Sequence, residues 1–301
     1  MSESFIQANG VRLAYEEFGD TSDPAIVLIM GLGGQMISWP DEFCQSLAGT
    51  GYRVVRFDNR DYGLSQKMTG FETFGLLRLV LLMHFNVQVG VPYTLHTMAD
   101  DTVALMSALG IPQAHVVGVS MGGMIAQLIA ANHPQQTLSL TSIMSTSGRR
   151  SLPSTRPHIT RQMARPAPIG RRATIQRSVE SLKLVGSPQH MASDDQLWNK
   201  FETLYRRCHH PMGTLRQTAA IAASADRSRI LPKISAPTLV IHGEVDPLIP
   251  VEGGIDTANL IPNSTLEVIT GMGHDLPRPL LPQIADLITT HTNKLHNAHA
   301  I

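Results

Sequence analysis

The sequence predicts an α/β protein, with a mostly parallel β-sheet covered by helices on both faces and a helical insertion. Three observations carry this prediction. Short apolar runs of strand length recur along the chain, helical patterns separate them, and one long stretch, residues 147–230, contains no strong strand. Strands that alternate with helices favour a parallel sheet, because each helix returns the chain to the start of the next strand.

The expected strands begin with a hairpin. Residues 5–8 and 11–18 are joined by Asn9-Gly10, a pair that suits a two-residue turn with positive φ at both positions. The next run, AIVLIM, is apolar throughout, as expected of a strand that is covered on both faces. Runs of similar character follow at 52–57, 115–119, 137–144, 238–242 and 265–270.

Helical patterns lie between these runs, at 39–48, 97–109, 121–132 and 254–260, and a last helix is expected at 280–295. After Ser147 proline, arginine and helical patches replace the alternation, which resumes near Ile234. We therefore expect one sheet-based core, formed by residues 1–146 and 231–301, and a helical cap formed by residues 147–230.

Composition and charge exclude several classes of protein. The 24 basic and 24 acidic residues balance, whereas nucleic-acid-binding proteins usually carry a basic excess, so we expect no nucleic-acid partner. The N-terminal residues lack the basic start and apolar run of a secretory signal, and we expect a cytoplasmic protein. Cys44 and Cys208 form no CxxC motif; two reduced, buried thiols are expected, and a single bridge is the alternative.

A nucleophile is predicted by the string Gly-Val-Ser-Met-Gly at residues 118–122. An apolar strand enters this string and a helical pattern leaves it. A strand-to-helix turn this sharp holds its serine in a strained backbone conformation and requires small neighbours. The hydroxyl of Ser120 then lies at a helix N-terminus, where backbone N–H groups favour negative charge. The alternative is a structural serine in a glycine-rich turn.

A serine hydroxyl needs a base, and a histidine base needs a carboxylate to orient it. His274 lies in a glycine-flanked loop after the last expected strand and before the last helix, which distinguishes it from most of the 13 histidines. Asp246 follows the expected strand at 238–242, and Glu244 is a nearby competitor. The chain order Ser120, Asp246, His274, with each residue after a strand, predicts a catalytic triad.

Residues 30–34, Met-Gly-Leu-Gly-Gly, follow the expected strand at 25–30. Glycines allow backbone amides to approach a substrate oxygen closely. The N–H groups of Leu32 and Met121 are therefore the predicted oxyanion donors, because Met121 directly follows the nucleophile. A plain tight turn is the alternative for this loop.

Five motifs occur in order: MGLGG, FDNRDYGLS, GVSMGG, GEVDPLIP and GMGHDLP. Together they resemble the α/β-hydrolase superfamily over nearly the whole chain. Residues 30–31, 39–43, 58–65 and 114–121 are most similar to small bacterial carboxylesterases and anthracycline methylesterases. The resemblance implies the α/β-hydrolase fold, and it implies the same five residues as nucleophile, partners and oxyanion donors. In one departure, Met30-Gly31 stands where many relatives have His-Gly.

The resemblance implies a serine carboxylesterase that acts through an acyl-enzyme on small to medium apolar esters. A methylesterase, a C–C bond hydrolase or a perhydrolase with the same triad stays open, as does a ligand-binding protein with little turnover. Haloalkane dehalogenases and epoxide hydrolases of this fold need a carboxylate at the position of Ser120. The serine therefore excludes these two classes. The sequence contains no metal-ligand spacing, P-loop or GxGxxG string, so we expect no metal and no organic cofactor. A monomer or a homodimer without stable membrane insertion is expected.

Three further features lie outside these motifs. Asp58, Arg60 and Asp61 are expected to brace their loop by ion pairing. Residues 74–91 are apolar almost throughout, and we expect either core packing or an apolar wall of the acyl pocket. The start of the cap holds eight arginines and no acidic residue among them, which suits a solvated outer face or the steering of anionic substrates: Arg149, Arg150, Arg156, Arg161, Arg165, Arg171, Arg172 and Arg177.

Overall fold

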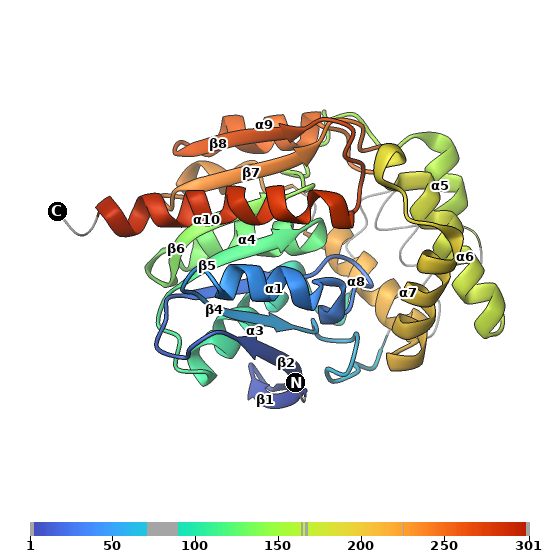
Figure 1. Cartoon of the computed structure of the whole chain (residues 1–301), viewed down its shortest axis with the longest axis horizontal. Helices are drawn as coiled ribbons and strands as arrows, with labels where there is room; N and C mark the ends of the chain where they lie inside the picture. The colour runs from blue at the N-terminus through green and yellow to red at the C-terminus, as the bar shows by residue number, and fades with distance from the viewer. Residues whose placement is uncertain (1–2, 71–89, 164, 166–167, 225, 299–301) are drawn as a thin grey trace.

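The computed structural model describes residues 3–70, 90–163, 165, 168–224 and 226–298. Among these residues eight strands form one sheet in the order β1-β2-β4-β3-β5-β6-β7-β8 (Figure 1). The strands are β1 Ser4–Ala8, β2 Val11–Phe18, β3 Ala25–Ile29, β4 Arg53–Phe57, β5 Ala114–Val119, β6 Thr137–Ile143, β7 Thr238–Gly243 and β8 Ser264–Ile269. The pairs β1–β2 and β2–β4 are antiparallel and the other five pairs are parallel, so the mostly parallel sheet is confirmed.

The hairpin and the central strand β3 agree closely with the structure predicted from the sequence. Asn9 and Gly10 both have positive φ, 47° and 75°, as their turn requires. Strand β3 is buried at every position. Ile26 and Leu28 pack into the apolar cluster on one face of the sheet, whereas the intervening Val27 and its neighbour Ile29 pack into the cluster on the other face.

Helices cover both faces of the sheet, with α3 and α4 packed on one face and α1 and α10 on the other (Figure 1). The helices of the core are α1 Asp41–Ala48, α3 Leu95–Ala108, α4 Met121–Asn132, α9 Glu252–Leu260 and α10 Leu281–Ala298. None of the described helices is long and apolar enough to cross a membrane.

Two helix starts differ from the expected ones. Helix α1 begins at Asp41 rather than at residue 39, because Trp39 and Pro40 have extended backbones. Helix α3 begins at Leu95 rather than at residue 97, because the side chain of Thr94 accepts a hydrogen bond from the amide of Thr97 and caps the helix. The helical periodicity of apolar residues alone does not show where such a cap begins the helix.

Among the described residues, four α-helices lie between β6 and β7 in the chain, and we call residues 147–230 the insertion. They are α5 Pro157–Met163, α6 Arg171–Val185, α7 Asp194–Arg207 and α8 Pro211–Ala223, and they gather at one end of the sheet (Figure 1). Cys44 is buried and Cys208 half-buried, and both thiols are free, so the alternative of a bridge is wrong. The predicted apolar wall at 74–91 falls outside the described residues for all but its last two positions.

Candidate active site

Ser120 occupies a tight turn between β5 and α4. Its backbone has φ 55° and ψ −117°, a strained conformation for a residue with a side chain. Gly122 must be glycine, because a Cβ there would lie 2.1 Å from the carbonyl oxygen of Ile29. The turn is fixed on its other side by hydrogen bonds from the Ser120 amide to the Ile143 carbonyl, at 2.9 Å, and from the Ser145 hydroxyl to the Ser120 carbonyl, at 2.9 Å.

The structure brings Ser120, His274 and Asp246 together from the ends of three strands. The Nε2 atom of His274 lies 3.0 Å from the Oγ atom of Ser120, and its Nδ1 atom lies 2.7 Å from the Oδ2 atom of Asp246. These are hydrogen-bond distances for a hydroxyl, a base and an orienting carboxylate. The imidazole can therefore accept the hydroxyl proton while the carboxylate holds its Nδ1–H.

The carboxylate of Asp246 is buried and oriented by the backbone. Its Oδ1 atom accepts hydrogen bonds from the amides of Leu248 and Ile249, both at 2.9 Å, which leaves Oδ2 for the imidazole. Glu244, the competitor in the sequence, is exposed and accepts a hydrogen bond from the Gly271 amide at 3.2 Å. The structure therefore places Asp246 at the imidazole.

A second histidine lies beside Asp246, and sequence reasoning missed it. His242 is fully buried on β7, and its Nε2–H donates to the Ile249 carbonyl at 2.9 Å. The same nitrogen lies 3.6 Å from Oδ2 of Asp246. Burial lowers the pKa of this imidazole below its ordinary value, although the Ile249 carbonyl and Asp246 oppose the shift. Its position in a buried strand, four residues before Asp246, was the available signal.

The glycine loop passes directly beside the nucleophile. A Cβ on Gly31 would lie 3.2 Å from the Cβ of Ser120. Among the described residues, no backbone hydrogen bond outside the regular helices and strands uses the amide of Leu32 or Met121. Both predicted oxyanion donors therefore stand on segments that adjoin Ser120, and their role stays a prediction.

The chain was compared with known proteins. A family model described as alpha/beta hydrolase fold matches residues 24–277. The chain belongs to this family. It is 27% identical to the rhodomycin D methylesterase DauP of Streptomyces sp. strain C5 and 26% identical to the rhodomycin D methylesterase DnrP of Streptomyces peucetius. Each alignment covers 97% of this chain and 98% of the relative.

Solved structures support the same fold. A crystal structure described as a membrane phospholipase A, a novel bacterial virulence factor, superimposes with a TM-score of 0.77. The match covers 98% of this chain and 87% of that one at 24% sequence identity, so it bears on the fold alone. The expected resemblance to the α/β-hydrolase superfamily and its methylesterase branch is confirmed by the family match and by the two relatives.

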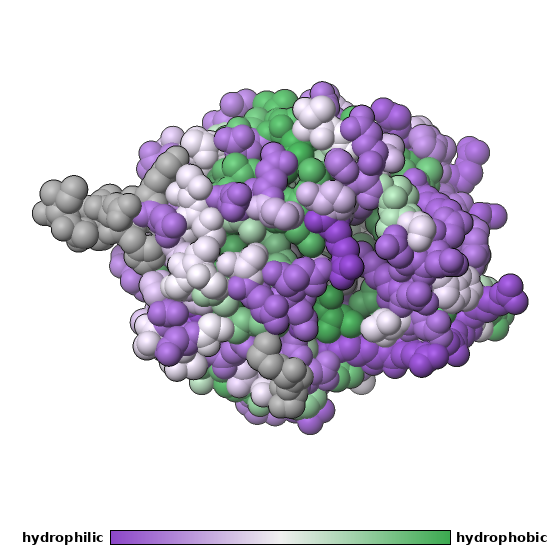
Figure 2. All heavy atoms as spheres, in the orientation of Figure 1, coloured by the Kyte–Doolittle hydropathy of each residue, from purple (hydrophilic) through white to green (hydrophobic). Residues whose placement is uncertain are grey.

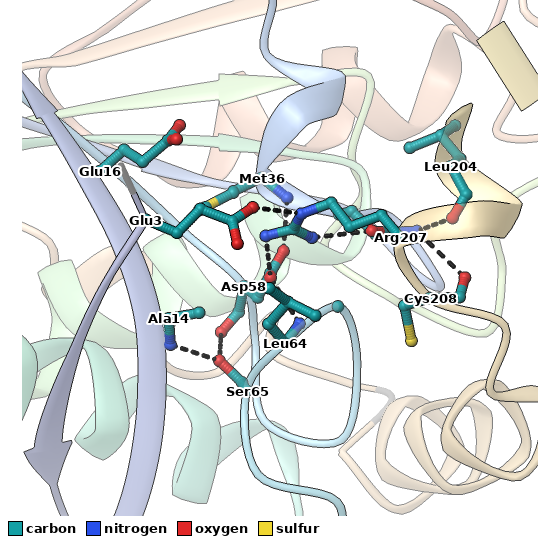
Figure 3. Close-up of polar contacts among 12 residues, drawn as sticks. Glu3, Ala14, Glu16, Met36, Asp58, Leu64, Ser65, Leu204, Arg207 and Cys208 are labelled. Atoms are coloured by element: carbon teal, nitrogen blue, oxygen red, sulfur yellow. Dashed lines mark hydrogen bonds and ion pairs between the residues drawn. The ribbon is translucent and has the colours of Figure 1, made fainter. Parts of the chain in front are cut away.

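In this α/β hydrolase, Asp58 links Met36, two residues after the glycine loop, to Arg207 of the insertion (Figure 3). Its buried carboxylate accepts hydrogen bonds from the Met36 amide, at 2.7 Å, and from the Leu64 amide, at 2.8 Å. The same carboxylate pairs with the guanidinium of Arg207, at 2.7 Å, at the end of α7. Arg207 also donates to the side chain of Gln35 at 2.7 Å. One cation of the insertion therefore contacts both Asp58 and the segment that follows the glycine loop.

The predicted bracing by Arg60 and Asp61 is confirmed, with partners far away in the sequence. The guanidinium of Arg60 pairs with Asp101 on α3. Asp61 accepts from Nε of Arg216, at 2.6 Å, on α8 of the insertion. Burial raises the pKa of the Asp61 carboxyl, but hydrogen bonds from Arg216 and its other donors outweigh burial and hold the pKa below its ordinary value.

A cavity of 920 Å³ opens at the seam between the core and the insertion. Its wall combines residues of α7, among them Lys200, with Asp275 beside the predicted base. The face in Figure 2 is hollowed along this seam, and the outer surface of the insertion is mostly hydrophilic. Among the described residues no group of three His, Cys, Asp or Glu side chains could hold a metal ion.

Proposed function

We propose that this α/β hydrolase is a serine-dependent carboxylic ester hydrolase. The observation that carries the proposal is the hydrogen-bonded chain from Ser120 through His274 to Asp246, at 3.0 Å and 2.7 Å, beside a glycine loop with available amides. Hydrolase-family membership and two methylesterase relatives that match almost end to end support the same reaction class. A purely ligand-binding protein would not need this geometry.

In the proposed mechanism, Nε2 of His274 takes the hydroxyl proton as Oγ of Ser120 attacks the ester carbonyl carbon. The amides of Leu32 and Met121 then stabilise the tetrahedral oxyanion, which is worth about 3 kcal/mol for one such donor in related sites. The protonated imidazole, stabilised by Asp246, gives its proton to the leaving alcohol. Water enters, loses a proton to the imidazole and releases the acid by the same steps.

A methyl ester of a carboxylic acid is the substrate class that we propose first. The two relatives are named rhodomycin D methylesterases and are matched over 98% of their length. Small apolar esters with other alcohols are the second class, because the triad itself does not select the alcohol. Hydrolysis of a C–C bond and perhydrolysis remain alternatives that the same three side chains could serve.

We also propose that the insertion, residues 147–230, caps this site and selects the substrate. Two contacts support a cap. The side chain of Gln217 on α8 accepts a hydrogen bond from the Gly33 amide at 2.9 Å, and Arg207 pairs with Asp58 behind the same loop. A segment that touches the oxyanion loop stands where it can limit access to an ester.

The decisive experiment measures turnover of p-nitrophenyl esters of increasing acyl length, with methyl esters of bulky acids in parallel. Ser120→Ala should lower kcat by at least about 10⁴-fold, because the members of a triad act as a unit. A fluorophosphonate should label the wild-type protein on the peptide that contains Ser120 and should leave the variant unlabelled. Far-UV circular dichroism and the melting temperature of the variant should match the wild type.

Two results would contradict the proposal. Wild-type turnover by Ser120→Ala would place the nucleophile elsewhere. Labelling of Ser120 without turnover of any ester in the panel would favour the ligand-binding alternative. Turnover of bulky methyl esters well above that of p-nitrophenyl acetate supports the methylesterase class, and the reverse order supports a general carboxylesterase.

A further inference from the structure

The loop that carries His274 is attached to the insertion at one short junction, Val185 to Ser187, between α6 and the short helix η3 (Pro188–His190). The His274 amide donates to the Val185 carbonyl at 2.7 Å. One residue earlier, the Gly273 amide donates to the Ser187 hydroxyl oxygen at 2.9 Å. Consecutive amides of the loop are thus held by the insertion and not by the sheet.

The hydroxyl of Ser187 also connects to the residue after the histidine. Oγ of Ser187 donates to Oδ1 of Asp275 at 2.6 Å, and the Ser187 amide donates to the same oxygen at 2.8 Å. One hydroxyl therefore accepts from the residue before His274 and donates to the residue after it. A hydroxyl group does both through a single oxygen atom, and alanine at this position would leave the buried Gly273 amide without its acceptor.

Backbone packing at the junction leaves little freedom. A Cβ on Gly273 would lie 2.4 Å from the carbonyl carbon of Gly186, and a Cβ on Gly186 would lie 2.8 Å from the Leu182 carbonyl oxygen. Gly273 thus allows the loop to touch the junction backbone to backbone, and Gly186 allows the junction to close against the end of α6 and the side chain of Asp275. Ser187 itself has no exposed surface, so water cannot replace its hydroxyl where the fold is closed.

We propose that Ser187 is a positioning residue, through which the insertion holds the imidazole of His274 at its distance from Ser120. The inference rests on the proposed function and extends it. The sheet places the nucleophile and Asp246, whereas the junction fixes the backbone on both sides of the base. A displacement of α6 or η3 then moves the base relative to a stationary nucleophile. Asp275 belongs both to this junction and to the wall of the cavity at the seam. A molecule bound in the cavity would therefore lie against the junction.

The test compares Ser187→Ala with a matched control, Ser193→Ala. Ser193 lies in the same insertion, caps α7 through the Gln196 amide at 3.3 Å and, among the described residues, forms no side-chain hydrogen bond with the histidine loop. Loss of either hydroxyl removes hydrogen bonds from the insertion and lowers the melting temperature. Only Ser187→Ala should lower kcat, by about 10-fold to 100-fold, with KM almost unchanged, because a base displaced by a fraction of an ångström reacts poorly.

A second readout does not depend on turnover. The far-downfield proton resonance of the Nδ1–H···Oδ2 bond between His274 and Asp246 reports the order of the imidazole. In Ser187→Ala this resonance should broaden or disappear, while in Ser193→Ala it should persist. Gly186→Ala, which keeps the hydroxyl but forces the junction away from Leu182 and Asp275, should reproduce the loss of kcat.

The outcomes separate this inference from the proposed function. If Ser120→Ala loses turnover while Ser187→Ala keeps wild-type kcat and the downfield resonance, the positioning role is wrong and the ester hydrolase stands. Equal losses of kcat in Ser187→Ala and Ser193→Ala would show a general effect of destabilising the insertion and would also overturn the role. If Ser120→Ala keeps turnover, the proposed function itself has failed.

Discussion

The two ends of the proton-transfer pair are held in different ways. Ser120 stands on a turn whose shape is imposed by backbone contacts within the core, such as that of Gly122 with Ile29, and by hydrogen bonds to the neighbouring strand β6. His274 stands on a loop whose amides reach into the insertion. The nucleophile is therefore fixed by sterics among consecutive core elements, and the base by hydrogen bonds between distant segments.

This difference determines what each region can tolerate. A strained φ at Ser120 persists only because the surrounding core over-determines it, so a substitution that adds bulk at the glycines of the turn should affect folding as well as catalysis. A hydrogen-bonded junction can loosen while the sheet stays intact, so a change there should affect kcat before stability. The insertion could then vary among relatives to suit different substrates, provided that it keeps its hold on the base.

The largest effect that sharpens this comparison is expected at the carboxylate of Asp246. Asp246→Asn should lower kcat by about 10⁴-fold, because the amide favours the wrong imidazole tautomer and does not stabilise the imidazolium. Glu244→Gln is the matched control on the same loop, and its exposed side chain should tolerate the change. Steady-state kinetics with one p-nitrophenyl ester measures kcat for both variants. A large loss in Glu244→Gln with a harmless Asp246→Asn would move the third role to Glu244.

The next effect is expected at the turn of the nucleophile. Gly122→Ala places a methyl group 2.1 Å from a backbone oxygen, which cannot move without displacing β3. We expect the free energy of unfolding to fall by about 3 kcal/mol or more, together with a loss of activity. Gly90→Ala is the control, because its Cβ would meet nothing within 4 Å. Urea unfolding followed by tryptophan fluorescence measures the free energy of unfolding of both variants, and turnover of a p-nitrophenyl ester measures their activity. A stable, inactive Gly122→Ala would contradict the view that sterics of the core fix the turn.

Sequence reasoning reached the parts of the site that are encoded locally. The turn at Ser120 follows from small residues between a strand and a helix, and the roles of His274 and Asp246 follow from their order after strands. The structure places these side chains within hydrogen-bond distance of one another. The catalytic roles, the cytoplasmic location and the oligomeric state stay predictions.

Contacts between the core and the insertion could not be predicted. The partners Arg207 for Asp58 and Arg216 for Asp61 are separated from them by about 150 residues, and their pairing depends on how the helices dock. Ser187 is one serine in a polar stretch, and its sequence neighbours do not indicate that its side chain is buried. Local pattern predicts elements and turns, whereas such pairs require the assembled tertiary structure.

A smaller effect is expected from the second histidine beside Asp246. Burial depresses the pKa of His242 in the folded chain, so below about pH 6.5, the ordinary pKa of histidine, the unfolded chain binds a proton that the fold resists. Stability is therefore fully present above this pH and falls as pH drops toward the folded pKa, with a slope of at most about 1.4 kcal/mol per pH unit.

His242→Gln should flatten this slope, because glutamine can donate to the Ile249 carbonyl and does not titrate. Urea unfolding at pH 7.5 and pH 5.5 measures the difference between the two proteins. The remaining slope in the variant reports other groups, including His210, whose pKa is also lowered by burial. An unchanged slope would mean that the fold does not lower the pKa of His242. A steeper slope in the variant would mean that the fold stabilises the protonated imidazole, with its charge held by Asp246.

The smallest effect concerns the outer face of the insertion. Six of the eight arginines at its start are exposed. Two of the eight form ion pairs: Arg149, which is half-buried, with Asp256, and Arg171, which is exposed, with Glu202. We expect a solvated surface, since exposed charges farther from the site than about 10 Å are largely screened at physiological salt. The double variant Arg156→Glu with Arg161→Glu should change kcat/KM by less than about twofold for neutral and anionic esters alike. A salt titration of turnover with both esters is the measurement. If only the anionic ester lost kcat/KM in the variant, and only at low salt, these arginines would steer substrate and the insertion would act on charge as well as on the position of the base.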